Sequence, residues 1–320
     1  MSEPVKHRVL QHGRLIPAVE QNLARHFDIV PLWQQADPLA FLRAQGERFP
    51  ALVCSARHGI DGALIAGVPG LRAIASFGAG YDTLDIGTAQ RLGVQVSSTP
   101  DVLNDCVADL AWGALIDIAR GLTESDRFLR RGAWLQGPFR LATRVSGKRL
   151  GIVGLGRIGR AIAQRGAGFA MDIRYHNRRP VDGVPYAHVA ELAELARWAD
   201  FLVVVVAGGS GTQHLISADI LAALGPQGYL VNVARGSAVD EAALTAALQA
   251  RAIAGAALDV FEREPCLPEQ LAGLDNVLLL PHIGTATHDT RQAMGELVVE
   301  NLHAFFRTGR LCTPIPETVC

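Results

Sequence analysis

Three glycines near the middle of the 320-residue chain form the pattern Gly154-x-Gly156-x-x-Gly159 between an apolar run and a helix-forming stretch. In a strand, turn and helix unit the first glycine makes the tight turn and the second lets the backbone approach a pyrophosphate. The third lets the helix pack closely on the strand, and the helix N-terminus offers free N–H groups and partial positive charge to phosphates. The pattern therefore predicts a dinucleotide site. The segment expected to contact the cofactor comprises Gly154, Leu155, Gly156, Arg157, Ile158 and Gly159.

A second apolar run, 171–176, leads into Asn177-Arg178-Arg179, and Asn177 lies 23 residues after Gly154. An NAD site would carry an acidic side chain about 20 residues on, for the ribose 2′-hydroxyl. No Asp or Glu stands there, and the two arginines offer planar, permanently charged groups suited to a phosphate. The alternative is a solvated arginine pair at the end of a strand. We favour a 2′-phosphate and therefore NADPH over NADH, with NADH still possible.

Three later apolar runs each end in a residue that could act on a substrate. The run 229–233 leads to Arg235, the run 254–258 is followed by Asp259 and Glu264, and the run 277–280 leads to His282. Parallel strands deliver the residues that follow them to one edge of the sheet, which is where ligands bind. Each residue alone has an ordinary explanation as a surface or core side chain. Their convergence on one edge favours a catalytic set of Arg235, Glu264 and His282.

The chemistry of these three side chain types fits hydride transfer to a 2-oxo acid. An arginine can grip the substrate carboxylate at two points and polarise the carbonyl. A histidine can protonate the carbonyl oxygen near neutral pH while a nicotinamide supplies the hydride. A glutamate beside the histidine would favour its charged form and fix its orientation.

The elements that must position these residues alternate along the whole chain. The expected strands are 8–11 (a weak candidate), 28–32, 51–55, 71–76, 94–97, 150–153, 171–176, 201–206, 229–233, 254–260 and 277–280. The expected helices between them are 19–26, 41–48, 61–65, 86–92, 189–198, 218–224 and 241–249. Such alternation predicts an α/β protein with parallel sheets, and the unbroken Val, Leu and Ile runs are typical of strands covered on both faces.

A helix expected over 104–120 is apolar on nearly every side, which predicts burial between domains or subunits. An ordinary core helix is the alternative. The following segment, 123–132, continues helically, and the loop around Trp134 is a candidate dimer contact.

Composition excludes several classes of protein. With 49% hydrophobic and 19% charged residues the chain is globular, and a net charge of −1 gives no basis for a nucleic-acid or membrane-surface partner. The N-terminal segment lacks a signal-peptide pattern, and no apolar run approaches the ~18 residues of a membrane span. Five cysteines without paired spacing predict reduced thiols in a cytoplasmic protein, with no disulfide framework and no metal site.

Four segments together resemble the D-isomer-specific 2-hydroxyacid dehydrogenases, and the resemblance covers nearly the whole chain. They are Gly154-Leu-Gly-Arg-Ile-Gly159, Val231-Asn-Val-Ala-Arg-Gly-Ser-Ala-Val-Asp-Glu241, Leu258-Asp-Val-Phe-Glu-Arg-Glu-Pro265 and Pro281-His-Ile-Gly-Thr-Ala-Thr287. Within the family, 177–179 and 102–110 are most similar to the NADPH-preferring glyoxylate/hydroxypyruvate and hydroxyphenylpyruvate reductases.

The resemblance implies roles for further residues. It assigns catalysis to Arg235, Glu264 and His282 and makes Asp259 a contact of the nicotinamide carboxamide. It implies that the backbone N–H groups of Ala79 and Gly80 meet the substrate carboxylate, beside Arg235 and His282. Further cofactor contacts are expected from Val233, Ala234 and Gly284.

The resemblance also implies two doubly wound α/β lobes with the active site in the cleft. A flavodoxin-like substrate lobe would comprise 1–99 and 288–320, and a Rossmann cofactor lobe 100–287. A last helix at about 291–306 would cross back to complete the first lobe. The family is usually homodimeric, through the helix after Pro100 and the loop near Trp134. Val107 and Gly208-Gly209 depart from residues that relatives carry near the cofactor.

Two other functions remain as alternatives. A dinucleotide-sensing, corepressor-like protein could share the fold and show little turnover, since fold alone does not fix function. A 3-phosphoglycerate or formate dehydrogenase is disfavoured by the arginine pair, by Glu264 where formate dehydrogenases carry glutamine, and by the expected lack of a C-terminal regulatory extension.

Overall fold

The computed structural model describes residues 6–319. These residues form two compact units, one made of the segments up to Leu103 and from Thr285, the other of Asn104–Gly284. The chain therefore passes between the units at Leu103 and at Gly284, where the sequence led us to expect 99 and 287. Each unit has its own parallel sheet, which confirms the expected α/β class.

Unit 1 is built on a five-stranded sheet in the order β2-β1-β3-β4-β5. Its strands are β1 (Arg8–His12), β2 (Asp28–Pro31), β3 (Ala51–Ser55), β4 (Ala73–Phe77) and β5 (Gln95–Ser97). Its helices are α1 (Pro17–His26), α2 (Pro38–Gln45), α3 (Gly62–Ala66), α4 (Ile86–Arg91) and α12 (His288–Thr308). This strand order is that of a flavodoxin-like sheet.

Strand β1 is the element of unit 1 that the sequence indicated least clearly. It lies inside the sheet, where Val9 pairs with Ile29 of β2 and with Ala51 of β3. Val9 and Leu10 are fully buried, so this short strand contributes to the core although Arg8 and Gln11 flank them. The last helix, α12, packs on α1 and β4 and so belongs to unit 1, as expected of the returning helix.

Unit 2 is built on a seven-stranded parallel sheet in the order β12-β11-β10-β9-β6-β7-β8. Its strands are β6 (Arg149–Val153), β7 (Asp172–His176), β8 (Ala187–His188), β9 (Phe201–Val204), β10 (Tyr229–Asn232), β11 (Gly255–Leu258) and β12 (Val277–Leu279). Its helices are α5 (Asn104–Arg120), α6 (Leu122–Arg130), α7 (Arg157–Gly168), α8 (Leu192–Trp198), α9 (Ala218–Leu224), α10 (Glu241–Gln249) and α11 (Glu269–Ala272). The short β8 and α11 were not expected from the sequence.

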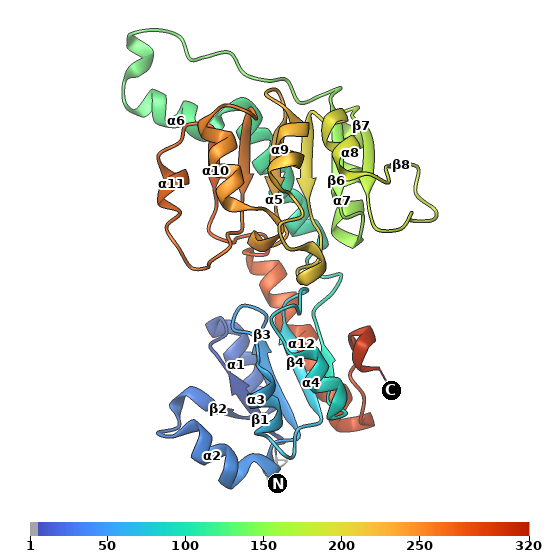
Figure 1. Ribbon diagram of the computed structural model, residues 1–320. Coiled ribbons are helices and arrows are strands. Elements are labelled where there is room, and N and C mark those ends of the chain that lie inside the picture. Colours follow the sequence, from blue (N-terminus) through green and yellow to red (C-terminus); the bar gives the residue numbers. More distant parts are fainter. Residues whose placement is uncertain (1–5, 320) are drawn as a thin grey trace. The chain divides into compact units, whose positions relative to one another are not determined.

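The sheet of unit 2 has the topology of a dinucleotide-binding fold. Counted from β6, the strands run 3-2-1-4-5-6-7, so the order reverses between β6 and β9 and creates a switch point at their carboxyl ends. Helices α8, α9 and α10 cover one face of the sheet, while α5 and α7 cover the other (Figure 1). Strands β9, β10 and β11 are buried along their whole length because helices lie on both faces.

Side-chain caps explain where several helices begin. An aspartate or threonine before the first turn accepts a hydrogen bond from a backbone N–H that would otherwise lack a partner. The capping residues are Asp37 of α2, Asp61 of α3, Asp85 of α4, Asp240 of α10 and Thr287 of α12.

Helix α5 corrects one expectation. It is not apolar all round, because Asp105, Asp109 and Arg120 are exposed. Asp105 and Asp109 each pair with Arg165 of α7, at 3.0 and 2.8 Å. The opposite side packs on α7, β10 and β11, so within unit 2 α5 is a core helix with one solvated edge.

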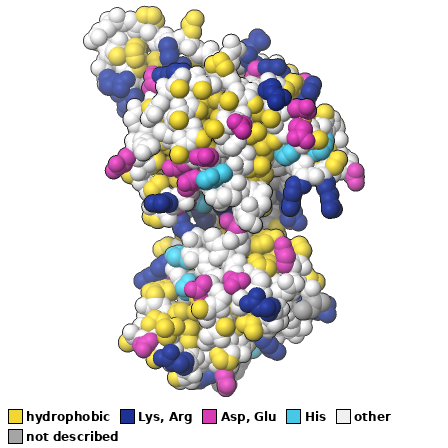
Figure 2. All heavy atoms as spheres, in the orientation of Figure 1, with side chains coloured by type: hydrophobic (Ala, Val, Ile, Leu, Met, Phe, Trp, Pro, Cys, Tyr) yellow, Lys and Arg dark blue, Asp and Glu magenta, His cyan; other side chains and the backbone are white. Residues whose placement is uncertain are grey.

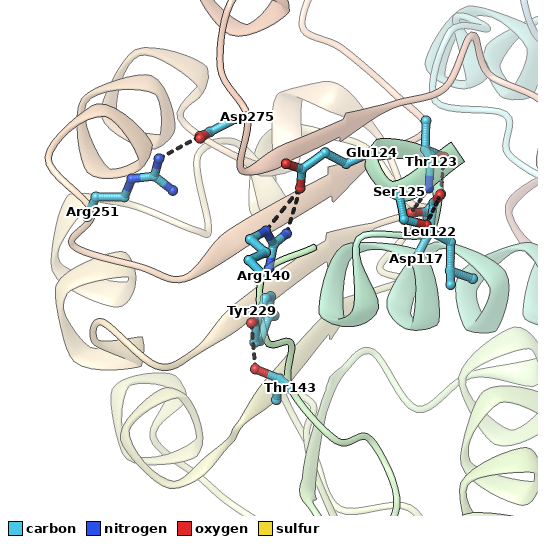
Figure 3. Close-up of polar contacts among 10 residues, drawn as sticks. All are labelled: Asp117, Leu122, Thr123, Glu124, Ser125, Arg140, Thr143, Tyr229, Arg251 and Asp275. Atoms are coloured by element: carbon cyan, nitrogen blue, oxygen red, sulfur yellow. Dashed lines mark hydrogen bonds and ion pairs between the residues drawn. The ribbon is translucent and has the colours of Figure 1, made fainter. Parts of the chain in front are cut away.

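The segment after α5 projects from the body of unit 2 (Figure 1). Figure 3 shows how it is held: Asp117 accepts hydrogen bonds from Thr123, and Arg140 pairs with Glu124 at 2.8 Å. Further along, the hydroxyl groups of Thr143 and Tyr229 lie 2.8 Å apart. The segment is thus held by hydrogen bonds near both of its ends. Its side chains Leu135 and Leu141 are exposed, at 93% and 97%.

Candidate active site

The glycine turn after β6 has the geometry that its sequence predicts. Gly154 adopts φ +104, a conformation that side-chain-bearing residues rarely adopt, and Gly159 packs so closely that a Cβ there would lie 2.2 Å from the Gly154 carbonyl oxygen. At Gly156 a Cβ would meet nothing within 4 Å. Helix α7 begins at Arg157 with no side-chain cap and no acidic residue in its first turn. A helix N-terminus without a side-chain cap, next to a glycine with open space where a Cβ would stand, fits a bound pyrophosphate.

Asn177, just beyond β7, braces this turn. Its Oδ1 accepts a hydrogen bond from the Leu155 N–H at 2.7 Å, so its side-chain oxygen is used by the protein itself. Arg178 and Arg179 are both exposed, and within residues 6–319 neither guanidinium makes a hydrogen bond or ion pair. The strand therefore ends with a fixed asparagine followed by two cations that no acidic side chain of the described chain neutralises.

Arg235 stands three residues after β10, on a turn held by a buried asparagine. Asn232, only 1% exposed, donates from Nδ2 to the Arg235 carbonyl at 3.0 Å and accepts from the Ala234 N–H at 3.0 Å. Arg235 Nη1 in turn donates to the Ala234 carbonyl at 2.9 Å. The neighbouring Val233 N–H bonds to Val204 of β9. These bonds fix the backbone of the turn from which the Arg235 side chain extends.

Glu264 and His282 are brought together as the sequence predicted. The Nδ1 atom of His282 lies 2.5 Å from Oε2 of Glu264, and the other carboxylate oxygen accepts the Phe261 N–H at 3.0 Å. The histidine side chain is 37% exposed and that of the glutamate 21%, so the pair lies at the surface of unit 2. Since a carboxylate only accepts, Nδ1 carries a proton, and Nε2 is the nitrogen left to act on a substrate.

Asp259 holds the backbone on which His282 stands. It is 3% exposed, and its two oxygens accept the N–H groups of Ile283 at 2.7 Å and Gly284 at 2.8 Å. Burial raises the pKa of Asp259, while these two N–H groups and the nearby His282 act in the opposite direction. His282 itself has φ +54, a left-handed conformation that is maintained by the contacts around it. Asp259 therefore accepts hydrogen bonds from the protein's own backbone, in addition to the nicotinamide contact expected for it.

The substrate loop expected from the sequence lies in unit 1, after β4. Gly78 adopts φ +156, and a Cβ there would lie 2.6 Å from the Cβ of Ala56, so the loop starts flush against the turn after β3. The Gly78 N–H is bonded to the Thr99 hydroxyl. Ala79 and Gly80 follow, both half-buried.

The sequence analysis missed the role of Asn232 and the hydrogen bonds that Asp259 accepts. Asn232 carried a signal, since a polar side chain closing a Val and Leu strand is uncommon inside a core. The bonds from Asp259 to Ile283 and Gly284 carried none, because they join positions 24 and 25 residues apart.

Two features are absent from residues 6–319. These residues contain no group of three or more His, Cys, Asp or Glu side chains arranged to hold a metal ion. Nor does this part of the chain contain a helix that is both long and apolar enough to cross a bilayer.

Comparison with known proteins now decides the family. Residues 112–284 match the model of the D-isomer specific 2-hydroxyacid dehydrogenase NAD binding domain. A hydroxyphenylpyruvate reductase of Plectranthus scutellarioides is 44% identical over 93% of this chain and 95% of its own length. The chain belongs to the D-isomer specific 2-hydroxyacid dehydrogenase family. It is thus an oxidoreductase whose second unit is a nicotinamide-cofactor domain.

Two further relatives match over nearly the whole chain. A glyoxylate/hydroxypyruvate reductase A of Arabidopsis thaliana is 42% identical over 93% of this chain and 95% of its own. Among solved structures, the NADPH-dependent glyoxylate/hydroxypyruvate reductase of Sinorhizobium meliloti, in complex with NADP and malonate, is 42% identical. It superposes with a TM-score of 0.92 over 98% of both chains.

Proposed function

We propose that this enzyme reduces a small 2-oxo acid to the D-2-hydroxy acid with NADPH. Glyoxylate, hydroxypyruvate or an aryl pyruvate is the substrate we favour, because relatives named for these activities are 42–44% identical over most of the chain. The observation that carries the proposal is the His282–Glu264 pair at 2.5 Å, on the carboxyl edge of a dinucleotide-binding sheet. We assign substrate binding to unit 1 and cofactor binding to unit 2.

The proposed cofactor contacts all lie in unit 2. The segment from Gly154 to Gly159 would hold the pyrophosphate at the N-terminus of α7, and Val233, Ala234, Asp259 and Gly284 would lie near the nicotinamide. Arg178 and Arg179 would bind the 2′-phosphate beside Asn177, which supports NADPH over NADH. When bound, the cofactor supplies the hydride that adds to the carbonyl carbon.

The proposed proton transfer follows from the hydrogen bonds of His282. Because Glu264 accepts the Nδ1 proton, Nε2 is the atom that would give a proton to the substrate oxygen as the carbon accepts hydride. Glu264 would stabilise the positive ring before the transfer and keep it in one orientation. Arg235 would bind the substrate carboxylate and polarise the carbonyl, on a turn that Asn232 fixes.

Two backbone groups of unit 1 complete the proposed set of contacts. We assign the N–H groups of Ala79 and Gly80 to the substrate carboxylate, the role that the family resemblance implies. Their loop starts from a constrained glycine, so its backbone is held in place before a substrate binds.

We also propose a homodimer in the cytoplasm, with no nucleic-acid or membrane partner. The projecting segment after α5 exposes Trp134 at 67%, Leu135 and Leu141, and Figure 2 shows hydrophobic and basic side chains together on that part of the surface. Exposed apolar side chains of this size favour a protein partner. Free thiols at Cys54, Cys266 and Cys312 are compatible with a reducing compartment.

The test of the proposed function is His282→Ala. Loss of a general acid should lower kcat about 10²–10⁴-fold with every 2-oxo acid that the wild type reduces. NADPH affinity should change little, because the ring bonds Glu264 and not the glycine turn. An unaltered kcat would show that His282 is not the acid.

A further inference from the structure

A second histidine–carboxylate pair lies close to the first. His214, in the loop after β9, places Nε2 2.8 Å from Oε1 of Glu262, two residues before Glu264. His214 also adopts φ +47, a conformation disfavoured for a residue with a side chain. A strained backbone is maintained only where surrounding contacts hold it, which points to a specific role for this side chain.

The backbone around His214 is joined to the segment that follows Arg235. The His214 N–H donates to the Ser237 carbonyl at 2.7 Å, and the Ile216 N–H donates to the Ala238 carbonyl at 2.9 Å. The loop after β9 is therefore fixed to the three-residue turn Gly236–Ala238. These bonds fix the backbone of His214 relative to the turn that follows Arg235.

Glu262 is also bonded to the start of α10. Its N–H donates to Oε2 of Glu241 at 3.1 Å, and its Oε1 accepts the Glu241 N–H at 3.4 Å. A carboxylate at a helix N-terminus is favourable, but here it faces the carboxylate of Glu241 as well. The donor from His214 gives Glu262 a third bond and offsets that repulsion.

The backbone next to Glu262 is in contact with the turn after Arg235. A Cβ on Gly236 would lie 1.8 Å from the carbonyl carbon of Phe261, so the two segments touch with no space for a side chain. The Phe261 N–H then donates to Glu264, which bonds His282. A displacement of the 261–264 loop would consequently move Glu264 relative to both His282 and Arg235.

We infer that His214 is a positioning residue of the active site, acting through Glu262 on the loop that carries Glu264. It holds that loop against the Arg235 turn, so that the carboxylate meets the His282 ring in the geometry observed. The inference rests on the proposed function, because its effect is exerted through the proton transfer assigned to His282.

The test compares three variants with wild type in steady-state reduction of a 2-oxo acid by NADPH. His214→Gly removes the ring and tolerates the positive φ, Glu262→Gln removes the charge, and the double variant combines them. Each single change should lower kcat about threefold to tenfold, since small displacements of catalytic groups are costly. KM for both substrates should stay within about twofold, because no binding group is touched. The double variant should be no slower than the slower single variant.

A matched control and a rescue separate positioning from general stability. Gln213→Ala alters the exposed neighbour on the same loop and should leave kcat unchanged. His214→Gln, whose amide can still donate to Glu262, should retain more of kcat than His214→Gly.

The outcomes distinguish this inference from the proposed function. If the wild type is active and His214→Gly has the same kcat as the Gln213→Ala control, the role of His214 is overturned and the proposed function stays intact. If His214→Gly lowers the thermal stability and changes KM and kcat together, His214 is a merely structural residue. That result would also overturn the inference. Failure of the wild type to reduce any 2-oxo acid would overturn the proposed function and this inference with it.

Discussion

Replacing Gly156 by alanine should separate cofactor binding from folding. An added Cβ would meet nothing within 4 Å, and the backbone at φ −83 and ψ −156 is one that alanine adopts. The residue is the N-cap of α7, so the change should cost at most about 1 kcal/mol of unfolding free energy. The methyl group would nonetheless stand where a pyrophosphate must approach the helix N-terminus.

The expected loss of affinity follows from the bonds at stake. Hydrogen bonds to a charged group contribute about 1.5–3 kcal/mol each, so displacing the phosphate from one N–H should weaken NADPH binding roughly tenfold to hundredfold. Gly159→Ala is the matched control. Its Cβ would lie 2.2 Å from the Gly154 carbonyl oxygen, which is backbone and cannot rotate away. Helix α7 would have to shift, at a cost of about 1–3 kcal/mol in stability.

The assay combines urea unfolding with titration of NADPH fluorescence for both variants. Gly156→Ala should unfold near the wild-type midpoint and bind NADPH weakly, while Gly159→Ala should show a clearly lower midpoint. NADPH affinity equal to wild type in a normally stable Gly156→Ala protein would refute the placement of the pyrophosphate. Equal destabilisation by the two substitutions would refute the packing argument.

Three further substitutions test other parts of the account. Arg178→Ala should raise KM for NADPH about tenfold to hundredfold and alter KM for NADH less than about twofold, because only NADPH carries the 2′-phosphate; parallel changes with both cofactors would contradict this. Glu264→Gln should lower kcat about tenfold or more without weakening NADPH binding, since it removes the charge 2.5 Å from His282; steady-state kinetics and a cofactor titration check it, and an unchanged kcat would count against it. Burial acts to raise the pKa of Asp200, but the hydrogen bonds that it accepts from Arg149 outweigh burial, and its pKa is lowered. The ionised carboxylate therefore stabilises the fold above about pH 4. This stabilisation is lost as the pH falls below that value. Asp200→Asn should therefore cost about 1 kcal/mol at pH 7 and at pH 5, and less near pH 3.5, in urea unfolding; a cost that grows on acidification would show that the sign is wrong.

The sequence predicted the fold and the proximity of Glu264 to His282, where local chemistry dictates structure. Gly154 can adopt φ +104 because it lacks a side chain, and the uninterrupted apolar runs are typical of strands covered on both faces. Because parallel strands place their carboxyl ends together, the sequence alone predicts that Glu264 and His282 lie close to each other.

What the sequence could not predict depends on contacts between distant segments. One edge of helix α5 is solvated, and there Asp105 and Asp109 form ion pairs with Arg165, which is at least 56 residues away in the sequence. Strand β1 lies inside its sheet because two neighbours pair with it, although its own pattern is weak. The bonds from Asp259 to the His282 loop follow from the register of β11 and β12, which no spacing rule supplies.

The central claim is that this enzyme reduces small 2-oxo acids with NADPH, and one measurement tests it most directly. Oxidation of NADPH and of NADH should be followed with glyoxylate, hydroxypyruvate, pyruvate and 4-hydroxyphenylpyruvate as acceptors. The account predicts turnover with at least one of these acids and a clear preference for NADPH. Equal use of both cofactors would contradict the role of Arg178. Tight cofactor binding without turnover on any acid would contradict the proposed reaction and favour a cofactor-sensing protein.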